Sequence, residues 1–149
     1  MTQEEKQLLL KDLCARLPYG AEVSLADGIS GMVTSISTVP HGTFVTVYFN
    51  RDDVKDISLE EIKPYLRPIK SMTLEECDKL FKILDIREDS GEWLKINDIG
   101  VLRLFTENGK DFYEIAEAMD YLYSIHVDFR DLIPVGLALE APEGMYKTE

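Results

Sequence analysis

The spacing of the hydrophobic positions changes twice along the chain, and the first stretch is helical. Between residues 3 and 17 the apolar residues recur at intervals of three and four, which is the spacing of one face of an α-helix. Acidic residues precede this stripe and Pro18 follows it, so the end signals agree with the periodicity. The predicted stripe consists of Leu10, Leu13, Cys14 and Leu17.

From residue 21 to about residue 59 the apolar positions alternate with a period of two. Four segments rich in Val, Ile, Thr, Phe and Tyr, separated by turn residues, predict a four-stranded antiparallel meander. They read AEVSL, GMVTSISTV, TFVTVYF and VKDISL. Both faces of the third segment are partly apolar, so the sheet must curl on itself or be covered by a helix. We expect either an SH3-like small antiparallel β-barrel capped by the first helix or a curved open sheet.

Residues 60–71 contain Pro64 and Pro68, which prevent a continuous helix and favour extended backbone before each proline. This segment is expected to connect two parts of the chain. The first part, residues 1–70, holds the N-terminal helix and the small β-barrel or sheet. The second part, residues 71–149, is a helical subdomain with a hairpin. The two parts are expected to pack together as one unit of an α+β fold.

Helical spacing returns after the prolines. Thr73 and Glu76 form a capping box at the start of a helix that is predicted to run to about Asp85. Its apolar positions are Leu74, Cys77, Leu80, Phe81 and Leu84. Residues 86–109 predict a β-hairpin, or a short helix in the second half of this stretch.

A second capping box, Asp111 with Glu114, precedes a further helical stripe that ends at His126. The stripe consists of Phe112, Ile115, Ala116, Met119, Leu122, Tyr123 and His126. This spacing predicts another helix in the C-terminal half of the chain.

The segment from His126 to Gly136 has two interpretations. Asp128 is suited to be an N-cap, accepting hydrogen bonds from backbone N–H groups two or three residues on. Residues 129–135 would then form a short helical turn that ends at Gly136, with Arg130 on its outer side. Alternatively, His126 and Asp128 could act as metal ligands, or as a base with its orienting carboxylate. We prefer the cap, because side chains two residues apart converge only in a bend.

Charge is distributed unevenly over the 149 residues. Residues 1–70 carry 8 Lys and Arg against 10 Asp and Glu, a net charge of −2, and residues 71–149 carry 8 against 18, a net charge of −10. This acidity, with no basic stripe, argues against direct binding of nucleic acid, whose phosphates are contacted mainly by Lys and Arg. A solvated acidic surface is the simplest interpretation.

No N-terminal stretch has the order of a secretory signal, and no apolar run approaches the roughly 20 residues of a membrane-spanning helix. We therefore expect a cytoplasmic protein without membrane contact. The two cysteines, Cys14 and Cys77, lie on helical stripes and far from C-x-x-C spacing. This placement indicates small buried side chains rather than reactive thiols or a disulfide.

The sequence contains no recognisable catalytic, phosphate-binding or calcium-binding motif. No Ser or Cys lies in a G-x-S-x-G setting, and the segment from Gly28 to Gly31 lacks the lysine and the helix of a phosphate-binding loop. The acidic runs lack the spacing of a calcium loop. The sequence therefore predicts no catalytic residue, no metal and no cofactor.

Three segments carry a resemblance: LLLKDLCARLPYG, IKPYLRPIKSMTLEE and HVDFRDLIPVGLALEAPEGMYK. Together they cover about a third of the chain, and as a set in this order they resemble a family of uncharacterised small proteins encoded by gut anaerobes and their phages. The resemblance implies an accessory protein of a prophage or mobile element and brings no activity with it. It also implies a tryptophan where this chain has Tyr121.

The leading hypothesis is a non-catalytic protein-interaction module with an unknown protein partner. Small barrels often serve in binding, and aromatic side chains amid polar ones are typical of protein interfaces. The candidate partner-binding residues are Trp93, Tyr113 and Tyr121. The two tyrosines are expected on the outer face of the last predicted helix, beside Glu117 and Asp120. Trp93 could instead close the hairpin onto the core. The two alternative functions are an acidic decoy that mimics nucleic acid and a metal-dependent hydrolase.

Overall fold

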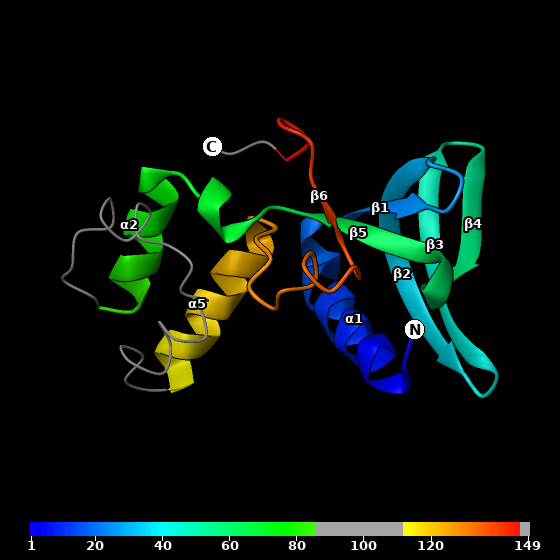
Figure 1. The fold of residues 1–149 in the computed structure, drawn as a ribbon, viewed down its shortest axis with the longest axis horizontal. Coiled ribbons are helices and arrows are strands. Elements are labelled where there is room, and N and C mark those ends of the chain that lie inside the picture. The colour runs from blue at the N-terminus through cyan, green and yellow to red at the C-terminus, as the bar shows by residue number, and fades with distance from the viewer. Residues whose placement is uncertain (86–111, 147–149) are drawn as a thin grey trace.

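The computed structural model describes residues 1–85 and 112–146 and shows an α+β fold (Figure 1). An open β-sheet lies at one end, α2 and α5 lie at the other, and α1 lies between them. The described α-helices are α1 (Gln3–Arg16), α2 (Leu74–Ile83) and α5 (Phe112–Ser124), and short 3₁₀-helices occupy Leu17–Tyr19, Leu59–Glu61 and Ile69–Ser71. The described strands are β1 (Glu22–Leu25), β2 (Ser30–Val39), β3 (Gly42–Asn50), β4 (Asp53–Ser58), β5 (Ile62–Leu66) and β6 (Leu139–Glu140).

Helix α1 confirms the helix predicted near the N-terminus, but its buried face differs from the predicted stripe. Leu9 and Leu13 are fully buried, whereas Cys14 is exposed, so the prediction that Cys14 is a core residue is wrong. The helix is covered on two sides. The sheet packs against Leu9 and Leu13, and the C-terminal half of the chain covers the side that carries Asp12 and Arg16.

The predicted four-stranded meander is confirmed as β1 to β4, and the sheet continues beyond it. The strand order is β4-β3-β2-β1-β5-β6, with every neighbouring pair antiparallel except β5 and β6. Strands β4 and β6 are the edges, and no pairing between them closes the described sheet. Of the two predicted forms, the open sheet is therefore found and the barrel is not. Because α1 already covers the inner face, the sheet buries its apolar side chains without closing.

The inner face of the sheet and α1 form one hydrophobic core. Its buried side chains are Leu9, Leu13, Val23, Val33, Val45, Val47, Ile57, Leu59 and Ile62. At Gly31 the strands approach so closely that an added Cβ would lie 2.7 Å from a methyl group of Val47 and 2.8 Å from the carbonyl oxygen of Tyr48. The close approach of β2 and β3 at this point therefore requires glycine.

The connection predicted at residues 60–71 is extended, but part of it belongs to the sheet. Strand β5 pairs with β1, and Pro64 lies opposite Val23. On its other side β5 is joined by β6, which comes from the C-terminal end of the chain. Residues beyond 71 thus contribute to the sheet as well as to the helices, while the division into two parts stays a prediction.

Helices α2 and α5 pack together and form a second core. The capping box of Thr73 and Glu76 is confirmed at the start of α2. The buried side chains of this core are Met72, Cys77, Leu80, Phe81, Leu84, Ala118, Leu122 and Val127. Leu74 and Ala116, both predicted on apolar stripes, are exposed because they lie outside the interface between the two helices. The predicted hairpin and the predicted cap at Asp111 lie outside the described residues.

None of the helices in the described part of the chain combines the length and the apolar character needed to cross a membrane.

Candidate binding cleft

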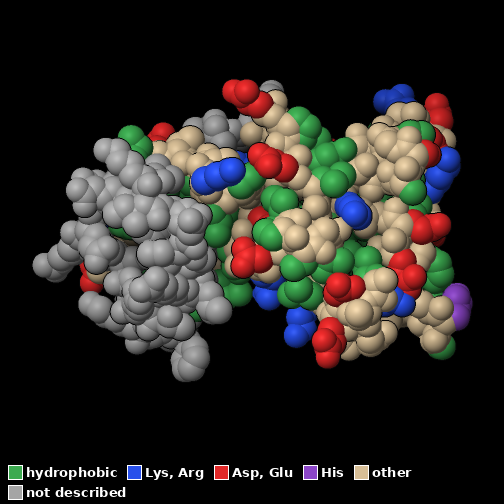
Figure 2. All heavy atoms as spheres, in the orientation of Figure 1, with side chains coloured by type: hydrophobic (Ala, Val, Ile, Leu, Met, Phe, Trp, Pro, Cys, Tyr) green, Lys and Arg blue, Asp and Glu red, His purple; other side chains and the backbone are tan. Residues whose placement is uncertain are grey.

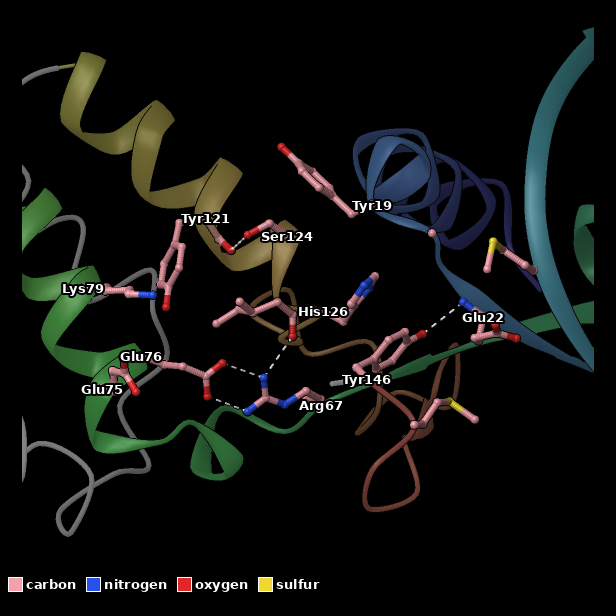
Figure 3. A pocket seen from close by; sticks show the side chains of 14 residues that line it. Tyr19, Glu22, Arg67, Glu75, Glu76, Lys79, Tyr121, Ser124, His126 and Tyr146 are labelled. Atoms are coloured by element: carbon pink, nitrogen blue, oxygen red, sulfur yellow. Dashed lines mark hydrogen bonds and ion pairs between the residues drawn. The ribbon is translucent and has the colours of Figure 1, made fainter. Parts of the chain in front are cut away.

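A cleft of about 450 Å³ lies where the sheet meets the helical part of the chain. One side of the cleft is formed by Tyr19, Glu22 and Met32, which come from the 3₁₀-helix after α1 and from the first two strands. Residues of α2 and α5, among them Tyr121, form the opposite side, and the C-terminal segment contributes Tyr146. Figure 3 shows these side chains arranged around the cleft, with Tyr121 and Glu22 on opposite sides of it.

The lower part of the cleft in Figure 3 holds an ion pair between Arg67 and Glu76. The guanidinium donates to both carboxylate oxygens, at 2.7 and 2.8 Å, and also to the carbonyl oxygens of Ile125 and Ser71. Burial by itself would raise the pKa of Glu76, but hydrogen bonds from Arg67 and Thr73 outweigh it and hold the pKa below its usual range. Both charges of the pair are therefore already bound by neighbouring groups of the protein.

His126 packs beside this ion pair and is almost fully buried. Its backbone is left-handed, with φ at +61°, and its imidazole stacks on the ring of Tyr146 with centroids 3.8 Å apart. Burial and the nearby positive charge of Arg16 lower the pKa of His126 to about 4, although the carbonyl oxygen of Tyr19 accepts a hydrogen bond from the imidazole. The imidazole is therefore neutral near pH 7.

The hydroxyl of Tyr146 links β1 to β5 just beyond the last residue pair of their ladder. The β1–β5 ladder includes the pair Val23 and Pro64, and the next two residues in register are Glu22 and Tyr65. The backbone N–H of Glu22 donates to the Tyr146 hydroxyl at 3.0 Å, and that hydroxyl donates to the carbonyl oxygen of Tyr65 at 2.8 Å. The side chain thus replaces a ladder hydrogen bond. Burial raises the pKa of Tyr146 to about 12, so the hydroxyl keeps its proton.

The carboxylate of Asp128 binds backbone N–H groups, as the sequence predicted, but the segment that follows it is a turn and not a helix. Its carboxylate accepts hydrogen bonds at 2.9 Å from the N–H groups of Leu132 and Ile133, which lie four and five residues on rather than two or three. Gly136 has the predicted left-handed conformation, with φ at +81°. Burial raises the pKa of Asp128 despite these two hydrogen bonds. The carboxylate and the His126 imidazole therefore have different partners.

Asp12 and Arg16 form a buried ion pair within α1, and Arg16 also joins this helix to Val127, which follows α5. The guanidinium donates to the carboxylate at 2.7 and 3.1 Å and to the carbonyl oxygen of Val127 at 2.8 Å. Arg130, predicted on the outer side of its turn, donates to the hydroxyl of Tyr123 and lies 3.8 Å from the Asp12 carboxylate. Charged residues four apart on a helix usually face solvent, so the sequence contained no signal of this burial.

The three candidate binding residues have different outcomes. Trp93 lies outside the described residues, and Tyr113 belongs to α5 but its side chain is outside the described part. Tyr121 lines the cleft, where it is half-buried and packs on the α2–α5 core instead of standing on the outer face with Glu117 and Asp120. Burial is the main cause that raises the pKa of Tyr121 to about 12.

The structure brings Tyr19, Met32 and Tyr146 to the same cleft, although the sequence singled out none of them. Tyr19 lies in a Pro-Tyr-Gly turn, a setting that exposes an aromatic side chain and could have drawn attention to it. Within residues 1–85 and 112–146, no group of three or more His, Cys, Asp or Glu side chains is placed to hold a metal ion.

No family model, no curated protein and no solved structure matches this chain. Its function must therefore be inferred from the residues of the cleft and of the surfaces that adjoin it.

Proposed function

We propose that this chain is a non-catalytic, cytoplasmic protein-interaction module whose cleft receives side chains of a partner protein. The observation that carries the proposal is the contrast between the rim and the base of the cleft. Tyr19 and Met32 are each 41% exposed at the rim, while Arg67 and Glu76 at the base are already bound to each other. Exposed aromatic and methionine side chains beside polar groups are typical of the centres of protein interfaces.

The chemistry of the cleft favours binding over catalysis. A general acid or base needs a titrating group within hydrogen-bond reach of the substrate. Arg67 and Glu76 satisfy each other, the His126 imidazole is stacked and nearly inaccessible, and the Tyr146 hydroxyl holds two strands together. These groups support the walls of the cleft. The Nδ1 atom of His126 has no hydrogen-bond partner in the described part of the chain, but it is buried.

The size of the cleft suits a few side chains of a partner. A volume of about 450 Å³ lies in the range of pockets that enclose a drug-sized molecule, roughly 300 to 1,000 Å³. Tyr19 and Tyr121 present rings from opposite sides. An apolar or aromatic side chain of the partner would be buried between them, and such anchors supply most of the binding free energy in many interfaces.

The distribution of charge gives no comparable support to an acidic decoy. On the face shown in Figure 2, Asp and Glu side chains are scattered singly or in small groups among other side chains. A mimic of nucleic acid would require a continuous row of carboxylates at the spacing of phosphates. The accessory role in a prophage or mobile element rests on the sequence resemblance, and it makes a protein of the host cell the first partner to seek.

The test is cross-linking and affinity capture from the native host, followed by affinity measurement with the purified partner. We expect Tyr19→Ser and Met32→Ser to weaken binding at least tenfold. Val135→Ser, which removes an exposed apolar side chain outside the cleft, should leave binding unchanged. A partner that binds all three variants equally contradicts the proposal. Binding that collapses between 50 and 500 mM salt would support the decoy instead.

A further inference from the structure

Apolar side chains continue from the cleft across the outer face of the sheet. Met32 pairs with Tyr48, and Tyr48 pairs with Val54, so three neighbouring strands carry these side chains directly beside one another. They are 41%, 42% and 52% exposed. α1 covers the opposite face of the sheet. Met32, Tyr48 and Val54 are called the outer row below.

The outer row ends at a carboxylate. Glu22 pairs with Met32 on the next strand, so its side chain follows those of the outer row in the same direction across the sheet. In the described part of the chain no cation pairs with the Glu22 carboxylate. Partial burial raises the pKa of Glu22, which is the effect expected of a carboxylate that has lost water without gaining a counter-ion.

We infer that the outer row and Glu22 bind an amphipathic helix of a partner protein, with apolar side chains on the outer row and a lysine or arginine on Glu22. The inference deepens the proposed function by naming the chemistry of the partner, and it rests on that function. Met32 and Glu22 also line the cleft, so the helix and the cleft contact belong to one continuous surface.

The spacing of the row favours a helix over an extended segment. Neighbouring strands lie about 4.8 Å apart. Residues three or four apart on a helix lie about 5–6 Å apart along one face, whereas alternate side chains of a strand lie about 6.6 Å apart. Three apolar side chains and one cation at helical spacing therefore match the row from Val54 to Glu22 position by position.

The carboxylates near the outer row favour a positively charged residue on the partner helix. The whole chain carries a net charge of −12, of which −2 falls in residues 1–70, where the outer row and Glu22 lie. Asp56 adds a second carboxylate on the same strand as Val54, two residues further along. A cationic residue on the partner would be attracted at long range and would then neutralise Glu22, whereas an acidic residue at that place would be repelled.

The test uses a defined peptide, so no natural partner has to be known. The peptide is an alanine-based helix of about 16 residues, with leucine at its third, seventh and tenth positions and arginine at its fourteenth. A matched peptide carries glutamate in place of the arginine. Binding of both to the full chain is measured by fluorescence anisotropy, and the contact is mapped by amide chemical shifts.

We expect the arginine peptide to bind about fivefold or more tightly than the glutamate peptide and to shift the amides of Met32, Tyr48 and Val54. Glu22→Gln should remove this preference, and Glu22→Lys should reverse it. Tyr48→Ser and Val54→Ser should each weaken binding of the arginine peptide, with circular dichroism showing that the exposed substitutions leave the fold intact.

Three results would overturn the inference: equal binding of the two peptides, a preference that survives in Glu22→Gln, or self-association of the chain through the outer row. Met32 belongs to both tests, so the two proposals are separated by Tyr19, which lines the cleft but is not part of the outer row, and by Tyr48, which belongs to the outer row but does not line the cleft. A partner lost in Tyr19→Ser but retained in Tyr48→Ser would leave the cleft contact standing and remove the helix site.

Discussion

The ring of Tyr146 lies nearly parallel to the imidazole of His126, with centroids 3.8 Å apart and an angle of 14° between their planes. This stack holds the C-terminal segment against the base of the cleft. It also keeps water from one face of an imidazole whose pKa is already lowered by burial. The stability of the fold and the shape of the cleft are therefore linked through these two side chains.

Acid should destabilise the protein through His126. The pKa is about 4 in the folded chain and 6.5 in the ordinary side chain, so the unfolded state binds the proton more tightly. The resulting loss in the free energy of unfolding is absent well above pH 6.5. It grows as the pH falls towards 4 and reaches about 3 kcal/mol. Urea unfolding at pH 7.5 and 4.5 should show a larger loss in the wild type than in His126→Phe.

The comparison isolates the histidine because the other titrating groups are present in both proteins. Asp128, with a raised pKa, adds stability as the pH falls, and Glu76, with a lowered pKa, removes it. These contributions cancel in the difference between wild type and His126→Phe. Equal losses in the two proteins would show that the imidazole is not held neutral.

Removing the hydroxyl of Tyr146 should destabilise the protein without breaking the stack. Tyr146→Phe leaves the N–H of Glu22 and the carbonyl of Tyr65 without their shared partner. Unsatisfied buried groups of this kind cost about 1–3 kcal/mol. The check is the free energy of unfolding in urea, with Tyr19→Phe as a control that removes an exposed phenol and should change stability by less than about 0.5 kcal/mol.

Breaking the Asp12–Arg16 pair should cost more when one charge is removed than when both are. Asp12→Leu alone leaves a buried guanidinium without its carboxylate, and we expect a loss of about 3–5 kcal/mol. The double variant Asp12→Leu, Arg16→Met should be more stable than Asp12→Leu. Equal or lower stability of the double variant would mean that the contact of Arg16 with Val127 outweighs the ion pair.

Gly31→Ala should destabilise the sheet by about 1–3 kcal/mol, because the new methyl group overlaps the carbonyl oxygen of Tyr48. Backbone cannot move aside as a flexible side chain does. Ser30→Ala, at the neighbouring exposed position, is the control and should change little. Thermal unfolding of the two variants checks the prediction, and similar midpoints would contradict it.

Local signals predicted the helices and the meander, because a cap or a turn depends on residues only a few positions apart. The capping box of Thr73 and Glu76 is an example, since both partners lie within one helical turn. The same logic identified Asp128 as a group that organises backbone, although the sequence could not say that its hydrogen bonds would reach four and five residues ahead.

The cleft depends on contacts that no local pattern contains. Tyr121 was selected as an aromatic residue, but its position in the cleft depends on how α5 packs against α2. Cys14 looked like a core residue, and it is exposed because α1 is covered on two other sides. The choice between barrel and open sheet was likewise decided by the pairing of β5 with β1 and β6.

The sequence by itself determined the bounds of the three described α-helices and of strands β1 to β4, to within a few residues, and that the chain is acidic. It did not predict strands β5 and β6. Only the tertiary structure decided which charges are buried and where the cleft lies. The physical reason is distance along the chain: Arg16 finds its carbonyl partner 111 residues away, and Tyr146 binds backbone 81 and 124 residues away. Periodicity and caps act over a few residues, whereas burial and charge neutralisation depend on segments that meet only in the folded protein.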